Sequence, residues 1–219
     1  MREMEIQKTS DGSSTLYLPE MDEHYHSTNG ALTESLHVFI KTGLEAHEKS
    51  ELSVLEIGFG TGLNAMLTLK AADRLERCVN YSSIELYPLS KELVDSLDFG
   101  FDSHEDKANF SKLHDAEWNT SVAISERFVL KKIHGDLTKT VFEDRFDLVY
   151  FDAFAPDKQP DMWSEEIFRH IYEQMNDGGI FVTYCAKGVV RRMLQAVGFT
   201  TERLPGPPGK REMLRARKL

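Results

Sequence analysis

The chain has little cysteine and no long apolar run. Its 219 residues contain two cysteines, Cys78 and Cys185, which lie 107 positions apart with no paired-ligand spacing near either. This excludes a disulfide scaffold and a cysteine-rich zinc site, and it fits a reducing compartment. Residues 1–10 are polar and charged, and no run approaches the roughly 18 apolar residues of a membrane span. We therefore expect a cytoplasmic protein with no membrane contact and no secretory signal.

The sequence also lacks an evident set of metal ligands. His24 and His26 form an H-x-H pair in the segment 23–26, but no third ligand is placed beside them. Catalytic zinc sites use three protein ligands, so we interpret the pair as part of a loop edge and expect no metal. Cys185 has no adjacent base, which favours a small core residue over a nucleophile.

Charge is distributed unevenly along the chain. The formal net charge is −10, yet residues 187–219 contain nine basic and two acidic residues, so they carry +7 and residues 1–186 carry −17. The net negative charge of the whole protein repels a polyanion, but the basic C-terminal part can bind one. A solvated basic tail is the alternative. The candidate phosphate contacts are Lys187, Arg191, Arg192, Lys210 and Arg211.

From residue 52 onward, short apolar segments alternate with helical periodicity. This alternation predicts an α/β fold: a mostly parallel, seven-stranded sheet with helices on both faces. Residues 88–126 are charged and weakly periodic, and we expect them to be helical. Residues 1–50, with a strand at 15–18 and a helix over 32–44, are expected to pack as an extension on a core formed by residues 51–219. The seven strands are expected at 53–57, 79–85, 128–133, 146–152, 179–184 and on either side of the turn 205–209.

The first candidate site is a glycine-rich turn between an expected strand and an expected helix. Glycines there let a ligand approach the backbone, and the helix N-terminus adds N–H donors. A dinucleotide fingerprint, G-x-G-x-x-G, would place its third glycine one position later than this chain does. The spacing E-x-G-x-G-x-G therefore favours S-adenosylmethionine over NAD and FAD, with a purely structural turn as the alternative. The expected cofactor contacts in this turn are Glu56, Gly58, Phe59, Gly60, Thr61 and Gly62.

Acidic residues stand near the ends of the next two expected strands. Glu85 can accept hydrogen bonds from a ribose diol, as acids do in nucleotide-binding sheets. Asp136 can accept from an adenine amino group while Leu137 covers the ring. The alternatives are a solvated Glu85 and an Asp136 that caps the helix starting near Thr138, a role that can coexist with adenine binding.

The fourth candidate is Asp152, which directly follows the apolar segment 148–151 and begins the motif Asp152-Ala-Phe154-Ala-Pro156. The motif is similar to the acid-x-x-aromatic arrangement of amino-group methyltransferases, although its spacing differs. Methyl transfer from a sulfonium needs a neutral nitrogen held roughly 3 Å from the methyl carbon. A carboxylate can orient that nitrogen and accept its proton. We therefore predict a catalytic Asp152, with Phe154 and Pro156 at the substrate; a structural turn aspartate is the alternative.

Further motifs accompany these candidates along the chain. They include Asp11-Gly-Ser13, Gly30-Ala-x-x-Glu34-Ser35, Leu55-Glu-Ile-Gly-Phe-Gly-Thr-Gly-Leu-Asn64, Thr183-Tyr184 and Gly209-Lys-Arg-Glu-Met213. Together, from residue 11 to about residue 217, the motifs resemble the MnmD family, the methyltransferase half of bifunctional MnmC. The glycine turn and its acidic partners are common to many methyltransferases, whereas the remaining motifs are specific to this family.

The resemblance implies a class I S-adenosylmethionine-dependent methyltransferase with a Rossmann-like sheet. Its implied reaction is methylation of the 5-aminomethyl group on wobble 5-aminomethyl-2-thiouridine in tRNA, giving 5-methylaminomethyl-2-thiouridine. It places the three turn glycines and Glu85 at the cofactor, Asp136 near the adenine and Asp152 in catalysis. By the same resemblance we expect three more residues around the cofactor pocket: Tyr25, Glu34 and Asn64.

The chain departs from bifunctional MnmC in one respect, because the glycine fingerprint of the FAD-dependent oxidase half is absent. A separate enzyme is therefore expected to supply the aminomethyl precursor. We expect the tRNA anticodon loop to dock on the basic C-terminal segment. Two alternatives act on a small amine: an N-methyltransferase, or an aminopropyltransferase that uses decarboxylated S-adenosylmethionine. A non-catalytic tRNA- or cofactor-binding module is disfavoured because both main motifs are intact.

Overall fold

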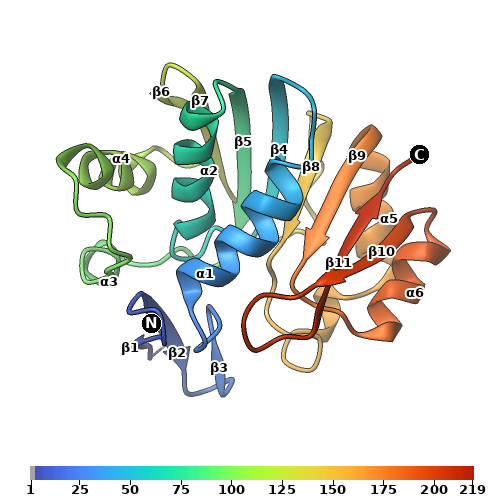
Figure 1. Cartoon of the computed structure of the whole chain (residues 1–219), viewed down its shortest axis with the longest axis horizontal. Helices are drawn as coiled ribbons and strands as arrows, with labels where there is room; N and C mark the ends of the chain where they lie inside the picture. The colour runs from blue at the N-terminus through green and yellow to red at the C-terminus, as the bar shows by residue number, and fades with distance from the viewer. Residues whose placement is uncertain (1–2) are drawn as a thin grey trace.

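The computed structural model describes residues 3–219, and its centre is a single large sheet with helices on both faces (Figure 1). The strand order across the sheet is β10-β11-β9-β8-β4-β5-β7-β6. Five central strands are parallel: β4 (Glu51–Ile57), β5 (Cys78–Glu85), β7 (Phe128–His134), β8 (Phe146–Phe151) and β9 (Met175–Thr183). The predicted α/β class and parallel sheet are confirmed.

Three further strands pair antiparallel to their neighbours at the sheet edges. β11 (Glu212–Arg217) pairs with β9 and with β10 (Thr200–Pro205). The third, β6 (Ser121–Ser125), pairs with β7, so within residues 3–219 the sheet has eight strands where the sequence predicted seven. β6 lies in the stretch expected to be helical, which does contain the helices α3 (Lys91–Val94) and α4 (His104–Asp115).

The two faces of the sheet bury alternate residues of each strand. Val54 belongs to a core beneath α2 (Leu63–Arg74), whereas its neighbour Leu55 belongs to the opposite core. The first core also holds α1 (Ala31–Ser35), whose helix continues as π-helical turns over Leu36–Leu44. The opposite core packs α5 (Glu165–Gln174) and α6 (Gly188–Ala196). Within the described residues, 3–219, no helix is long and apolar enough to cross a membrane.

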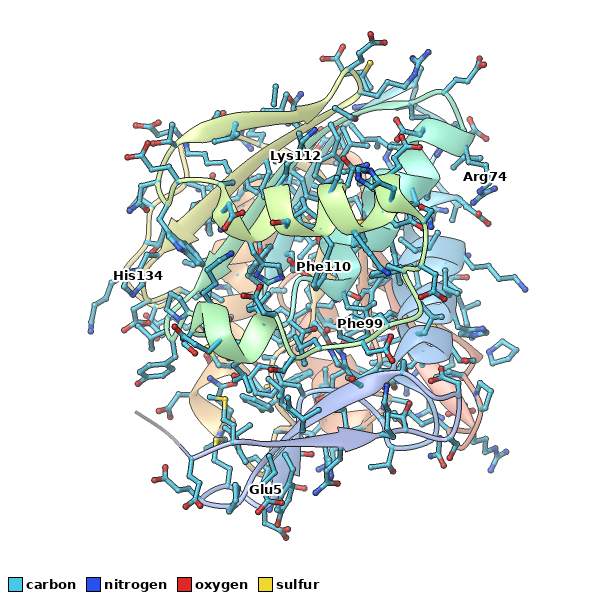
Figure 2. The ribbon with its side chains drawn as sticks, turned by 90° about the vertical axis from the view of Figure 1, so that its left-hand side faces the viewer. Glu5, Arg74, Phe99, Phe110, Lys112 and His134 are labelled. Atoms are coloured by element: carbon cyan, nitrogen blue, oxygen red, sulfur yellow. The ribbon has the colours of Figure 1, made fainter. Side chains whose placement is uncertain are left out.

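A small N-terminal sheet lies across the edge where the parallel strands end (Figure 1). It consists of β1 (Glu5–Lys8), β2 (Ser14–Leu18) and β3 (Glu23–His24), and β2 confirms the strand expected at 15–18. Figure 2 shows Phe99 and Phe110 between α4 and this sheet, with their ring centroids 6.0 Å apart. Phe99 also packs edge-on against His26 with ring centroids 6.2 Å apart, and the backbone N–H of Ser14 donates to the carbonyl of Asp98 over 2.7 Å. These two contacts link the N-terminal segment to the stretch before α4; the division of the segment from the core at residue 50 stays a prediction.

Candidate active site

The glycine turn joins β4 to α2 at the carboxyl edge of the sheet. Gly58, Gly60 and Gly62 have φ angles of +94°, +48° and +73°, a left-handed region that side chains disfavour. A Cβ atom at Gly60 would lie 3.2 Å from the ring of Tyr25, and one at Gly62 would lie 2.7 Å from Nε2 of His114. The turn therefore needs glycine for both its backbone conformation and its packing.

A cavity of about 460 Å³ opens between this turn and the ends of β5, β7 and β8. Glu85 stabilises its wall by accepting hydrogen bonds from the backbone N–H of Gly60 (3.0 Å) and of Tyr87 (2.8 Å). Asp136 accepts from both the backbone N–H and the hydroxyl of Thr138, and these bonds and Lys139 lower the pKa of Asp136. The predicted site residues that line this cavity are Tyr25, Gly58, Phe59, Gly60, Thr61, Asn64, Glu85, Asp136, Leu137, Asp152 and Phe154.

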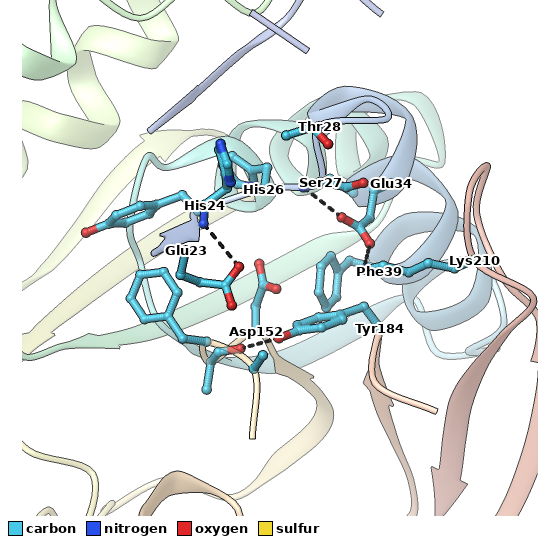
Figure 3. Close-up of a pocket in the computed structure, with 15 residues that line it drawn as sticks. Glu23, His24, His26, Ser27, Thr28, Glu34, Phe39, Asp152, Tyr184 and Lys210 are labelled. Carbon is cyan, nitrogen blue, oxygen red and sulfur yellow. Dashed lines mark hydrogen bonds and ion pairs between the residues drawn. The ribbon is translucent and has the colours of Figure 1, made fainter. Parts of the chain in front are cut away.

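A second, smaller cavity of about 240 Å³ adjoins the first (Figure 3). Glu34 accepts a hydrogen bond from the backbone N–H of Ser27 (3.1 Å) and forms an ion pair with Lys210. The Lys210 ammonium also lies 4.1 Å from the ring centroid of Tyr184, whose hydroxyl donates to the carbonyl of Ala153 (2.9 Å). Carboxylate, ammonium and aromatic groups thus surround a space large enough for a small polar group.

Asp152 lines both cavities, and Figure 3 shows its side chain directed into the smaller one. The side-chain amide of Asn64 donates a hydrogen bond from Nδ2 to Asp152 Oδ2 over 2.9 Å. Burial raises the pKa of Asp152 to about 7; the Asn64 hydrogen bond and the Lys210 ammonium oppose this, and Glu34 adds to it. Asp152 is therefore a carboxyl group poised to exchange a proton near neutral pH.

Glu56 lies outside both cavities, contrary to its expected contact with the cofactor. Side chains alternate along β4, so Glu56 shares the face of Val54 and points beneath α2. It is 1% exposed and accepts a hydrogen bond from the hydroxyl of Ser83 over 2.6 Å. Burial raises the pKa of Glu56 to about 8, so the side chain is mostly neutral at pH 7.

Several other predicted residues lie elsewhere than expected. Glu34 lines the smaller cavity instead of the cofactor-sized one, because α1 carries it to the Lys210 side of Asp152. Gly62 acts as the N-cap of α2 and packs against His114. The remaining predicted substrate contacts, which lie outside both cavities, are Pro156, Lys187, Arg191, Arg192 and Arg211.

Sequence reasoning missed His26, which lines both cavities and shares a hydrogen bond of 2.7 Å with the hydroxyl of Thr61. Burial lowers the pKa of His26 to about 4, so the ring is neutral. Its partner stands 35 positions away in the sequence, and no local pattern signals the contact. Among residues 3–219 no three His, Cys, Asp or Glu side chains gather in a geometry that could hold a metal ion.

Comparison with known proteins identifies the family of this chain. Residues 104–219 match the family described as S-adenosyl-L-methionine-dependent methyltransferase. The chain is 29% identical over 231 residues to the tRNA 5-methylaminomethyl-2-thiouridine biosynthesis bifunctional protein MnmC of Actinobacillus pleuropneumoniae, covering 93% of this chain and 34% of that protein. The same-named protein of Cupriavidus necator is 33% identical over 213 residues, covering 90% and 32%. The chain thus spans about a third of the length of these curated relatives.

Solved structures agree with the sequence matches. MNMC2 from Aquifex aeolicus superposes with a TM-score of 0.83 at 29% identity, covering 99% of this chain and 71% of that chain. Spermidine synthase from Thermotoga maritima superposes with a TM-score of 0.60 at 15% identity, covering 99% and 68%, and it shares the fold alone. The resemblance to the MnmD family that the motifs predicted is confirmed.

The residues of the larger cavity fit S-adenosylmethionine. Gly58 and Gly60 line the cavity without a Cβ atom, and Glu85 stands at the end of the neighbouring strand β5. Such a site offers backbone contacts for the methionine portion and a carboxylate for the ribose hydroxyls. The family match and this donor set agree: the chain belongs to the S-adenosyl-L-methionine-dependent methyltransferase family.

Proposed function

We propose that this protein methylates the 5-aminomethyl nitrogen of wobble 5-aminomethyl-2-thiouridine in tRNA, giving 5-methylaminomethyl-2-thiouridine. One observation carries the proposal: Asp152 stands where the two cavities meet, between the cofactor-sized cavity and the smaller polar one. A carboxyl group in that position can hold an amine next to the place where the methyl group of a bound donor would lie. The names of the matched MnmC relatives identify the modified nucleoside to test.

In the larger cavity, we propose that Gly58 and Gly60 hold the methionine portion of S-adenosylmethionine, while Gly62 starts α2 behind them. Glu85 accepts from the ribose hydroxyls, and Asp136 with Leu137 receives the adenine. The bound cofactor supplies a methyl group activated by its sulfonium. Tyr25 separates the two cavities, since its ring lies against Gly60 and packs edge-on against Phe154 with centroids 5.1 Å apart. We infer that this aromatic pair excludes water from the path between the donor and the acceptor.

In the smaller cavity, Asp152 orients the substrate amine and takes its proton. The amine lone pair forms the new C–N bond as the methyl–sulfur bond breaks, and the electron pair of that bond stays on sulfur. A primary ammonium has a pKa near ~10, so an ordinary aspartate is about six units too acidic to deprotonate it. With its pKa raised to about 7, Asp152 halves that gap to about three units, equivalent to ~4 kcal/mol.

We propose that tRNA docks through the basic C-terminal segment. Lys187 lies just before α6 and pairs with Asp157, and α6 itself carries Arg191 and Arg192. Lys210 reaches the smaller cavity from the loop between β10 and β11. The segment is therefore continuous with the place where the amine would bind, and its positive charge suits a phosphate backbone. A separate cytoplasmic enzyme would supply the aminomethyl precursor.

Transfer of labelled methyl groups from S-adenosylmethionine to tRNA lacking only this modification tests the proposal. Wild-type protein should label the tRNA, and Asp152→Asn should lose at least about a hundredfold in turnover while binding the cofactor normally. Full turnover by Asp152→Asn at neutral pH would refute the role of Asp152. Labelling of a free polyamine instead of tRNA would show that the acceptor is a small amine.

A further inference from the structure

Tyr184 lies in the smaller cavity between Asp152 and Lys210 (Figure 3). It is the residue that follows β9, and Asp152 is the residue that follows β8. These two strands are parallel neighbours, with Tyr150 opposite Val182. Continuing that register by two positions brings Asp152 and Tyr184 side by side at the carboxyl edge of the sheet, and both line the smaller cavity.

The backbone that follows Asp152 is held by side chains from other parts of the chain. The hydroxyl of Tyr184 donates to the carbonyl of Ala153 over 2.9 Å. The indole N–H of Trp163, just before α5, donates to the carbonyl of Phe154 over 2.7 Å. Ala153 is 7% exposed, so its carbonyl depends on the protein for a hydrogen-bond donor. Two successive carbonyls are therefore fixed immediately after the candidate catalytic carboxyl group.

The ring of Tyr184 makes a second contact in the same cavity. The ammonium of Lys210 lies 4.1 Å from the ring centroid and forms an ion pair with Glu34. A cation over the face of a tyrosine ring is attracted by the negative charge of that face. Tyr184 thus connects the Asp152 loop, through its hydroxyl, with the ion pair of Lys210 and Glu34, through its ring.

We propose that Tyr184 is a positioning residue for methyl transfer: its hydroxyl fixes the loop that begins at Asp152, and its ring keeps Lys210 paired with Glu34 beside that loop. The inference rests on the proposed function in one respect, since it takes Asp152 as the group that holds the amine. An in-line displacement tolerates little error in position, because a misplacement of about 1 Å can cost about a hundredfold in rate. A loop fixed by its carbonyls keeps Asp152 against the Asn64 amide that orients it.

The electrostatic surroundings keep the Tyr184 hydroxyl a donor. Burial raises the pKa of Tyr184, and the nearby Asp152 raises it further, so the hydroxyl stays protonated. For Asp152 itself, the hydrogen bond from Asn64 and the charge of Lys210 both lower the pKa. Loosening of either contact would therefore raise the pKa of Asp152. The titratable groups that act on Asp152 or respond to its charge are Glu34 from α1, Glu56 from β4, Tyr81 from β5, and Tyr184 and Lys210.

Two substitutions separate the hydroxyl from the ring. Tyr184→Phe removes only the O–H donor, and we expect it to lower kcat with tRNA about tenfold at an unchanged KM, because a buried carbonyl loses its partner. Tyr184→Leu also removes the ring, and it should in addition raise the KM for tRNA about fivefold, because Lys210 loses its support.

Tyr172 provides a matched control. It lies on α5 against the opposite core, and the ammonium of Lys218 lies 4.8 Å from its ring centroid. Tyr172→Phe therefore removes a hydroxyl from the same kind of lysine–tyrosine pair, away from Asp152. It should leave kcat and KM unchanged, and a loss equal to that of Tyr184→Phe would show that the effect is one of stability alone.

Titration of the Asp152 carboxyl group supplies a readout that needs no acceptor. NMR of the aspartate carboxyl carbons follows it, with the signal assigned by its loss in Asp152→Asn. Compared with wild type, Asp152 should titrate at higher pH in Tyr184→Phe, at still higher pH in Tyr184→Leu, and unchanged in Tyr172→Phe.

An unchanged titration in Tyr184→Phe would overturn the inference, and so would an unchanged kcat when wild type methylates tRNA. Coincident titrations of Tyr184→Phe and Tyr184→Leu would refute the role of the ring. The expected shifts in a protein that does not methylate tRNA would uphold the role of Tyr184 at Asp152 and refute the proposed function instead.

Discussion

The pH dependence of stability provides a thermodynamic test of the buried Glu56. Its pKa rises from 4.5 to about 8 on burial, so the folded protein binds more protons than the unfolded chain between these values. Unfolding then releases protons, and the free energy of unfolding falls as the pH rises from 4.5 towards 8. The full difference is worth about 5 kcal/mol. Glu56→Gln, which cannot ionise, escapes this loss.

We therefore expect Glu56→Gln to be more stable than wild type at pH 8.5 by about 2–5 kcal/mol, the lower value allowing for the cost of burying the amide. For a chain of this size the gain corresponds to a melting temperature about 5–15 °C higher. At pH 5 the two proteins should differ little. Urea unfolding of both proteins at the two pH values provides the assay. Equal stability at pH 8.5, or a less stable variant, would show that Glu56 is ionised in the folded protein.

Three further predictions concern the cofactor turn, the tRNA surface and the packing beneath the turn. Gly60→Ala should weaken S-adenosylmethionine binding, measured by calorimetry, at least about tenfold. The added Cβ atom would lie 3.2 Å from the ring of Tyr25, and the backbone at this position has a φ of +48°, which alanine disfavours. An unchanged affinity would contradict the cofactor assignment. Reversing Arg191 and Arg192 to Glu should raise the KM for tRNA by at least about tenfold at constant cofactor affinity, and unchanged tRNA binding would refute the docking model. Lys132 is 1% exposed and burial lowers its pKa to about 8. Since the unfolded lysine binds more protons, urea unfolding should show wild type gaining stability relative to Lys132→Met between pH 8 and pH 10, and parallel curves would contradict that.

The features that could be predicted from sequence have causes within a short stretch of chain. Gly58, Gly60 and Gly62 mark a turn because their backbone requires left-handed φ angles, and the apolar strand before them predicts its place in the sheet. Asp152 could be predicted as a site residue because it directly follows a strand whose six residues are all buried, where a carboxylate is poorly placed to serve solubility alone. The parallel core follows from the same alternation of strands and helices.

The features that could not be predicted depend on contacts between distant residues. Lys210 meets Glu34 across 176 positions of sequence, and His26 meets Thr61 across 35, so the composition of the smaller cavity becomes visible only in the fold. The sequence predicts helix where β6 lies, because this edge strand of five residues buries only one of them and therefore shows little of the apolar alternation typical of a strand. Glu56 belongs to the glycine motif, yet its direction is decided by the pleat of β4.

The most direct test of the central claim is the identity of the methylated nucleoside. Hypomodified tRNA, incubated with the protein and S-adenosylmethionine, would be digested to nucleosides and analysed by mass spectrometry. We predict that 5-aminomethyl-2-thiouridine gains the mass of one methyl group and becomes 5-methylaminomethyl-2-thiouridine, and that Asp152→Asn gives little of this product. An unmodified 5-aminomethyl nucleoside after incubation with wild-type protein that binds the cofactor would contradict the proposed function.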